Sequence, residues 1–276
     1  MTITSRQNPL VARFRDAARG DAGEVILLDG AHLVADAIAA GVTIELAAVT
    51  SAARERTDVR PLLAALADSG VTVATVAQPV MDAISPVRSA SGIAALAARP
   101  GSSADRLYAG ARSLVAIAVD VQDPGNLGAI VRVAEAAGGT GVVAAGASAN
   151  PFGWKALRGS MGSALRLPMA AGIDAEAAVA GARARGCRIV ATATRGGAPM
   201  FDVNLTGPIA VLIGGEGGGL PPSLVDAADE RVTIPMQRPV ESLNAAVTAA
   251  LILYEARRQR STTKLTKDTK HLKHET

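Results

Sequence analysis

Aromatic residues are scarce in this sequence. They make up 2% of the 276 residues, whereas hydrophobic residues as a whole make up 49%. A sizeable core can therefore be buried, but alanine, valine, leucine and isoleucine must fill it. If the chain binds nucleic acid, stacking of aromatic side chains on bases is not expected to dominate that binding.

Cysteine pairs, long hydrophobic runs and clustered histidines are missing as well. The single cysteine, Cys187, excludes an internal disulfide framework and stands in an apolar run, where a small buried side chain is expected. No apolar run approaches the roughly 20 residues of a membrane span, and the first residues contain no segment of secretory type. We therefore expect a cytoplasmic protein without a membrane partner. The three histidines, His32, His271 and His274, show no metal-ligand spacing, so no metal site is expected.

The formal net charge is only +3, although the pI is about 9.3. The tail, residues 261–276, carries four lysines against Asp268 and Glu275 and so supplies +2 of this total. Its polar composition predicts a disordered end. Because the rest of the chain is nearly neutral, nucleic-acid binding must be inferred from where arginines lie. Arg13 and Arg15 belong to a basic amphipathic segment, predicted to be a helix over 7–20, whose basic face either contacts phosphates or is simply solvated.

Apolar segments alternate with helical stretches from Glu24 onward, which indicates an α/β fold. Residues 99–106 lose this periodicity and collect turn residues, as a linker does. We therefore predict a first domain over 1–98, a linker over 99–111 and a second domain over 112–260. Predicted strands of the second domain, which should form a parallel sheet covered on both faces, are 113–120, 141–146, 187–193, 208–214 and 231–236.

Three stretches of the second domain, 120–138, 212–236 and 240–260, each pass from a strand or extended segment to a helix through a glycine or asparagine loop. Ligands of open α/β sheets bind at the carboxyl ends of strands, so these loops predict a small-molecule cleft. The run Gly214–Gly219 lacks the Lys-Ser/Thr of a P-loop, which argues against an NTPase. The main rival, a dinucleotide-binding oxidoreductase, is disfavoured because the G-x-G-x-x-G spacing is absent.

In order and spacing these stretches resemble the three signature motifs of the SpoU (TrmH) family of SPOUT methyltransferases. The first motif is matched by Asn126 and Arg132, and the second by Gly214 through Leu220 with Glu216 as its acid. The third is matched by Ile234-Pro235-Met236, by Ser242-Leu243-Asn244 and by the ending from Tyr254 to Gln259, with Ala245 where valine is more frequent. Residues 23–41 and 91–97 resemble the family's substrate-binding domain, with Asp29 where glutamate is more usual.

The resemblance implies a C-terminal parallel-sheet SPOUT domain with a deep trefoil knot, and a smaller N-terminal α/β substrate-binding domain. It implies a homodimeric enzyme that uses S-adenosylmethionine to methylate ribose 2′-hydroxyls of structured RNA. The implied catalytic residues are Asn126, Arg132, Glu216, Ser242 and Asn244. The implied cofactor contacts are Thr192, Gly214, Gly215, Glu216, Gly217, Ile234, Met236, Ser242, Leu243 and Asn244.

Several roles stay open at this point. Family resemblance makes Arg132 a proton acceptor, but a guanidinium has a pKa above roughly 12, so we favour a fixed cation beside the reacting oxygen. Glu216 is expected to hold Arg132 through a charge-assisted hydrogen bond. Ser242 would also serve as the N-cap of the next helix. Lys155 and Arg158 either bind RNA phosphates or are solvated helix charges.

The helix predicted over 243–253 is apolar on nearly every face, which favours burial against a second subunit. Ribosomal RNA is the favoured substrate class. Transfer RNA methylation and antibiotic-resistance methylation of ribosomal RNA remain alternatives. An RNA-binding protein without catalysis is a further alternative, disfavoured because Asn126, Arg132, Glu216 and Asn244 are all present.

Overall fold

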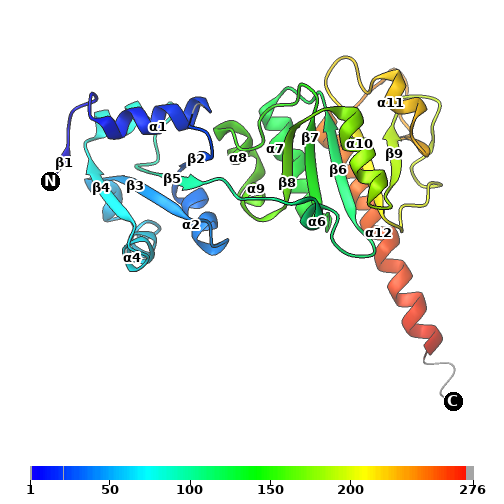
Figure 1. Cartoon of the computed structure of the whole chain (residues 1–276), viewed down its shortest axis with the longest axis horizontal. Coiled ribbons are helices and arrows are strands. Elements are labelled where there is room, and N and C mark those ends of the chain that lie inside the picture. The colour runs from blue at the N-terminus through cyan, green and yellow to red at the C-terminus, as the bar shows by residue number, and fades with distance from the viewer. Residues whose placement is uncertain (1, 21, 272–276) are drawn as a thin grey trace. The chain divides into compact units, whose positions relative to one another are not determined.

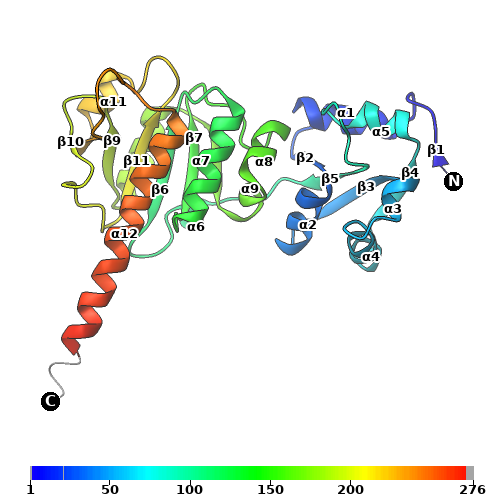
Figure 2. The ribbon, with the colours of Figure 1, turned by 180° about the vertical axis from the view of Figure 1, so that it is seen from behind.

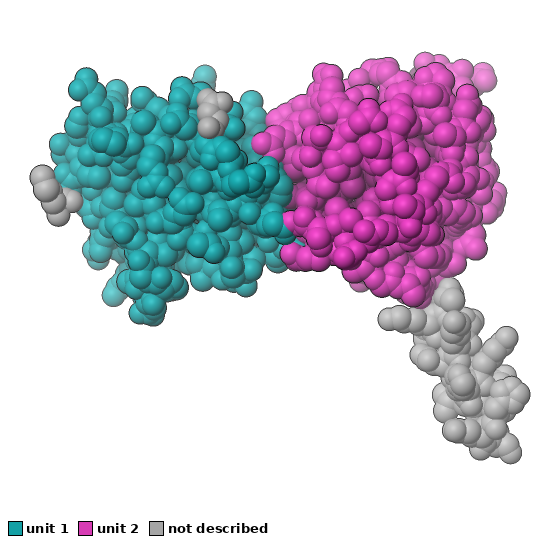
Figure 3. Space-filling view, in the orientation of Figure 1, with its two compact units in different colours: residues 1–101, 152–166 teal, residues 102–151, 167–276 magenta. Residues whose placement is uncertain are grey.

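The computed structural model describes residues 2–20 and 22–271. It divides into two compact units (Figure 3): residues 1–101 with 152–166, and residues 102–151 with 167–276. The boundary at 101–102 lies inside the segment predicted as a linker. The sequence-based assignment of 152–166 to the second domain is wrong, because this segment packs on the first unit, with Trp154 against its hydrophobic core.

The first unit contains a mixed five-stranded sheet in the order β1-β4-β3-β5-β2. Strand β3 pairs with β4 in parallel and with β5 antiparallel, and β5 pairs antiparallel with β2. The alternation of strands and helices expected from Glu24 onward is present in this unit. The bounds are β1 Thr2–Ile3, β2 Val25–Asp29, β3 Ile44–Thr50, β4 Thr72–Val76 and β5 Ile93–Ala98.

The helices of the first unit include the predicted basic helix, now α1 (Pro9–Arg19). It starts at Asn8, whose side chain accepts from the Leu10 amide, and it ends at Gly20 in the left-handed conformation. Its Phe14 side chain is fully buried in a core that also contains residues of α5 and of the sheet. The others are α2 Ala31–Ala39, α3 Ser51–Arg54, α4 Arg60–Asp68, α5 Gln78–Ile84, α8 Trp154–Ser160 and α9 Ser163–Arg166.

The second unit contains a seven-stranded sheet in the order β10-β12-β9-β11-β6-β7-β8, and every neighbouring pair is parallel. The predicted parallel sheet is thus confirmed. The short edge strand β8 was not predicted, because only its first residue is buried and Gly172 interrupts its apolar pattern. The bounds are β6 Leu114–Val119, β7 Gly141–Ala145, β8 Met169–Ile173, β9 Arg188–Thr192, β10 Ala198–Pro199, β11 Ile209–Gly214 and β12 Glu230–Thr233.

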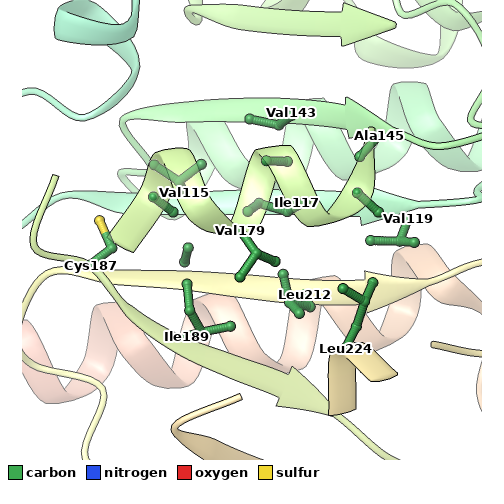
Figure 4. Packing of buried hydrophobic residues seen from close by; sticks show 14 of the residues in the cluster. Val115, Ile117, Val119, Val143, Ala145, Val179, Cys187, Ile189, Leu212 and Leu224 are labelled. Atoms are coloured by element: carbon green, nitrogen blue, oxygen red, sulfur yellow. The ribbon is translucent and has the colours of Figure 1, made fainter. Parts of the chain in front are cut away.

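Helices cover both faces of this sheet. Helices α7 (Pro124–Ala136) and α12 (Ala245–His271) lie side by side on one face, as Figures 1 and 2 show. On the other face α10 (Ala175–Ala184) packs its Val179 on alternate residues of β6 such as Ile117 (Figure 4). Cys187 lies in the same core, as predicted for a small buried side chain. Two short helices complete the unit, α6 Ala104–Leu107 and α11 Pro222–Asp226.

Helix α12 is assigned as far as His271, and the disorder predicted for the tail over 261–276 stays a prediction. No glycine or proline interrupts this stretch, and propagation of a helix costs little once its first turns are packed. Residues 272–276 of the predicted tail lie outside the described residues. None of the described helices combines the length and apolarity that a membrane crossing requires.

Candidate active site

A cleft of about 590 Å³ opens at the carboxyl edge of the second unit's sheet. Its walls come from the segments that follow β9, β11 and β12, and from the first turn of α12. All ten residues predicted to contact a cofactor line it: Thr192, Gly214, Gly215, Glu216, Gly217, Ile234, Met236, Ser242, Leu243 and Asn244. The position at strand ends is the one expected for a ligand site in a parallel sheet.

Two glycines, Gly214 and Gly215, allow backbone segments that build the cleft to pack closely against one another. A Cβ atom on Gly215 would lie 1.9 Å from the carbonyl oxygen of Asp120, in the loop after β6. A Cβ atom on Gly214 would lie 2.3 Å from the carbonyl carbon of Gly219, within the loop itself. No side chain fits at either position, so the glycines are needed for packing as well as for an open floor to the cleft.

We expect Gly215→Ala to disrupt this packing and the cleft with it. Because backbone atoms stand in the way, the loop itself must move, and overpacking of this kind costs about 1–3 kcal/mol. The melting temperature should fall, and affinity for S-adenosylmethionine, measured by calorimetry, should fall at least about tenfold. Gly207→Ala is the matched control, since it lies in the same unit outside the cleft lining and a Cβ there meets nothing within 4 Å. Equal affinities of the two variants would contradict this account.

A chain of amide and carboxylate side chains joins the three loops. The Asn126 Nδ2 atom donates to Glu216 Oε1 at 2.5 Å, and Asn244 Nδ2 donates to Asn126 Oδ1 at 2.9 Å. Asn126 sits in the first turn of α7, where its backbone N–H donates to Asp123 Oδ1 at 2.7 Å. The structure therefore brings Asn126, Glu216 and Asn244 together, as the resemblance implied for the catalytic set.

Arg132 does not belong to this chain of contacts. Its side chain is exposed, it does not line the cleft, and it makes no hydrogen bond or ion pair with another described residue. Six residues of helix turn the chain by about 240°, so Arg132 leaves α7 on a different face from Asn126. The prediction that Glu216 holds Arg132 is wrong within this chain, because no hydrogen bond or ion pair joins the two described side chains, and the contact made by Glu216 is with Asn126.

Ser242 lines the cleft, but it does not cap α12 as predicted. The helix begins at Ala245, and the cap is Asn244, whose Oδ1 atom accepts from the amides of Ala246 and Val247 at 2.9 and 3.3 Å. Asn244 therefore holds the helix start with its oxygen and Asn126 with its nitrogen. Ser242 is left exposed at the mouth of the cleft.

The sequence did not point to Thr194 and Arg195, which also line the cleft. They follow β9, and the position after a strand end was the available signal. Arg195 forms an ion pair with Glu241 at 2.6 Å, and both side chains are highly exposed. The predicted neighbour Thr192 uses its hydroxyl within the sheet, where it donates to the Leu212 carbonyl at 2.9 Å.

The segment from Tyr254 to Gln259, which resembles the ending of the third motif, has a structural role. Glu255 is buried on α12, and its carboxylate accepts from Arg258 and from Gln259. The hydrogen bond from Arg258 holds the pKa of Glu255 below its usual value. Gln259 reaches back to the segment before β11, where it donates to the Val203 carbonyl and accepts from the Leu205 amide.

The arginines predicted to bind RNA on α1 both have protein partners. Arg13 forms an exposed ion pair with Glu45 at 2.9 Å, and Arg15 donates to the Ala83 carbonyl at 3.0 Å. The other two predicted RNA contacts, Lys155 and Arg158, lie on α8 and line a second cavity inside the first unit.

The parallel sheet and the cleft at its carboxyl edge define an α/β domain of the SPOUT methyltransferase class. The SpoU rRNA Methylase family matches residues 113–254, just over half of the chain, and the chain belongs to this family. The match covers the segments that build the cleft.

Relatives resemble the whole chain. A 23S rRNA guanosine 2′-O-methyltransferase of Bacillus subtilis is 29% identical over 84% of this chain and 88% of its own. The structure of an AdoMet-bound rRNA methyltransferase from Sinorhizobium meliloti matches with a TM-score of 0.83 and 28% identity, over 94% of this chain and 97% of that one. A solved RNA 2′-O ribose methyltransferase matches with a TM-score of 0.79 and 32% identity, over 94% and 99%.

Proposed function

We propose that this chain is an S-adenosylmethionine-dependent methyltransferase that methylates a ribose 2′-hydroxyl in ribosomal RNA. The observation that carries the proposal is the linked set Asn126, Glu216 and Asn244 at a strand-end cleft lined by all ten expected cofactor residues. The names of the Bacillus subtilis and Sinorhizobium meliloti relatives support ribosomal RNA as the substrate class.

The residues of the cleft suit the cofactor. Its volume of about 590 Å³ lies within the range of pockets that bind small ligands. Gly214 and Gly215 leave peptide groups open to a ligand, while Ile234, Met236 and Leu243 supply apolar walls for an adenine ring. When bound, S-adenosylmethionine supplies an electrophilic methyl group.

The polar residues then orient the accepting hydroxyl. Asn126 uses both ends of its amide, on Glu216 and on Asn244, and so fixes the direction of the Glu216 carboxylate. Glu216 is exposed, and its Oε2 atom has no hydrogen-bond partner among the described residues. This oxygen is free to accept a hydrogen bond from a ribose hydroxyl. Arg132 would act as a fixed cation that stabilises the negative charge developing on the ribose oxygen, once a second copy of the chain completes the site.

The completed site includes a second copy of the chain in this proposal. On α12 three large apolar side chains, Val247, Leu251 and Tyr254, are spaced along one face and are 46%, 37% and 49% exposed. A second subunit would cover this stripe. Sedimentation of the full chain at several concentrations measures the association. The deep trefoil knot and a cytoplasmic location are part of the same proposal, supported by membership of the family.

The test is methyl transfer to isolated ribosomal RNA from S-adenosylmethionine carrying a tritiated methyl group. We expect labelled RNA, and nucleoside mass spectrometry should show a methylated ribose. RNA with 2′-deoxyribose at the mapped nucleotide should accept no label, because the hydroxyl is the acceptor. A methylated base beside an unmodified sugar would refute the proposal, as would RNA binding without any transfer. Label in transfer RNA alone would reject the substrate class.

A further inference from the structure

A second cavity, of about 550 Å³, lies within the first unit. Its walls come from the end of β2 and the start of α2, from the turn around Arg56 and Asp58, and from α8. Nothing in the proposed methyl-transfer site uses it. Its volume lies in the range of pockets that hold small ligands.

One wall of the cavity is cationic. Lys155 and Arg158 are exposed and three residues apart on α8, so both side chains lie on one face of that helix. Neither forms a hydrogen bond or ion pair with a described residue. By contrast, Arg56, which also lines the cavity, donates to both carboxylate oxygens of Asp58, at 2.6 and 3.0 Å. The Lys155 ammonium lies 5.5 Å from the centre of the Trp154 ring, and Arg158 has no such contact among the described residues, so α8 offers two cationic groups to an anion beside this ring.

The cavity lining also includes Asp29, a carboxylate with spare acceptor capacity. Asp29 is half-buried at the end of β2, and its two oxygens share the single hydroxyl proton of Ser85 at 3.1 and 3.2 Å. Burial raises the pKa of Asp29, while the Ser85 hydrogen bond and the charge of Arg158 lower it. A carboxylate has about four acceptor positions, so most of those on Asp29 remain unused.

The remaining lining includes the indole of Trp154 and the side chain of Met161, which is 50% exposed. The turn between α8 and α9, and the end of α9, contact Asp36 of α2 beside this lining. Arg166 pairs with Asp36 at 3.3 Å, and a Cβ atom on Gly162 would lie 2.2 Å from an Asp36 side-chain oxygen. The aromatic wall is therefore held in place beside the cationic and acidic groups.

We propose that this cavity binds one unpaired guanine nucleotide, with the base toward Asp29 and the phosphate toward Arg158 and Lys155. Guanine presents two adjacent N–H donors on its Watson–Crick edge, which matches the two oxygens of a carboxylate. Adenine offers one donor there, so it would leave part of the carboxylate unpaired. Proteins that read single-stranded RNA combine such edge contacts with an aromatic wall. The RNA source of the nucleotide rests on the proposed function, whereas the chemistry of the cavity does not.

The chain offers a direct probe of this cavity, because Trp154 is its single tryptophan. We expect guanosine monophosphate to quench the fluorescence of the full chain saturably, and to bind roughly tenfold or more tighter than adenosine monophosphate. Asp29→Asn should remove this preference, and Asp29→Glu should retain part of it. Arg158→Gln should weaken both nucleotides, while Arg60→Gln, an exposed arginine on α4 outside the cavity, should change neither.

Two results would overturn the proposal. Equal affinities for the two nucleotides would reject base recognition, and inorganic phosphate binding as tightly as guanosine monophosphate would reduce the cavity to an anion site. A second arm identifies the source, using a hairpin RNA with one unpaired guanosine and the same RNA with inosine, which lacks the 2-amino group. Displacement of guanosine monophosphate by the guanosine hairpin more than by the inosine hairpin supports RNA. No displacement by either would reject RNA as the source. These titrations contain no S-adenosylmethionine, so they are independent of methyl transfer.

Discussion

Arg132→Ala should lower turnover of the methyl-transfer reaction by roughly 10²–10³-fold, the usual contribution of one group that stabilises negative charge on a reacting oxygen. This corresponds to about 3–4 kcal/mol of transition-state stabilisation. Arg132 lies outside the cleft and has no partner among the described residues, so its loss should leave both the fold and the affinity for S-adenosylmethionine unchanged. Single-turnover kinetics with saturating cofactor, together with calorimetry, separate the two effects.

Two further variants test whether the loss of turnover is specific to the guanidinium of Arg132. Arg231→Ala removes an exposed arginine of the same unit whose ion pair with Asp226 should be worth less than about 1 kcal/mol, so its turnover should match the parent enzyme. Arg132→Lys keeps the charge without the planar fork of donors and should recover part of the rate. Full activity of the alanine variant would remove Arg132 from the mechanism. A parallel loss of cofactor affinity would instead assign it a structural role.

The arrangement of the cleft could be predicted because its determinants are local in sequence. Each of the three loops follows a buried, apolar strand or its extension, and parallel strands place their carboxyl ends at one edge of a sheet. The contacts of Asn126 with Glu216 and Asn244 follow from this meeting of loops. The close approach of Gly215 to Asp120 explains why glycine stands there, a reason that spacing alone does not give.

Other features depend on contacts between distant residues, which a local pattern does not contain. Residues 152–166 follow β7 in the chain but pack on the first unit, because Trp154 finds its apolar partners there. The expected contact between Glu216 and Arg132 failed for a geometric reason, since six residues of helix carry a side chain to another face. The second cavity could not be predicted from the sequence either, because Asp29 and Arg158 are 129 positions apart in the chain.

Arg260 on α12 carries the other large expected effect, on stability. It is half-buried, and its guanidinium donates to four backbone carbonyls, those of Leu205, Arg112, Ser113 and Gly207, at 2.6–3.2 Å. Burial, followed by the charge of Arg112, lowers the pKa of Arg260 to about 10. The group therefore stays protonated at neutral pH and keeps all its donors. These four hydrogen bonds join α12 to the segments that precede β6 and β11.

Arg260→Met should therefore destabilise the second unit by about 3 kcal/mol, because it keeps the apolar stem but leaves several carbonyls without a donor. The melting temperature should fall by about 6–12 °C for a unit of this size. Arg257→Met is the matched control, since Arg257 is exposed on the same helix and makes one contact, of 3.3 Å, with the Ala136 carbonyl. Arg260→Lys should lie between the two, because an ammonium group reaches fewer of the four acceptors. Calorimetric unfolding measures all three, and equal melting temperatures for Arg260→Met and Arg257→Met would show that water replaces the guanidinium at no cost.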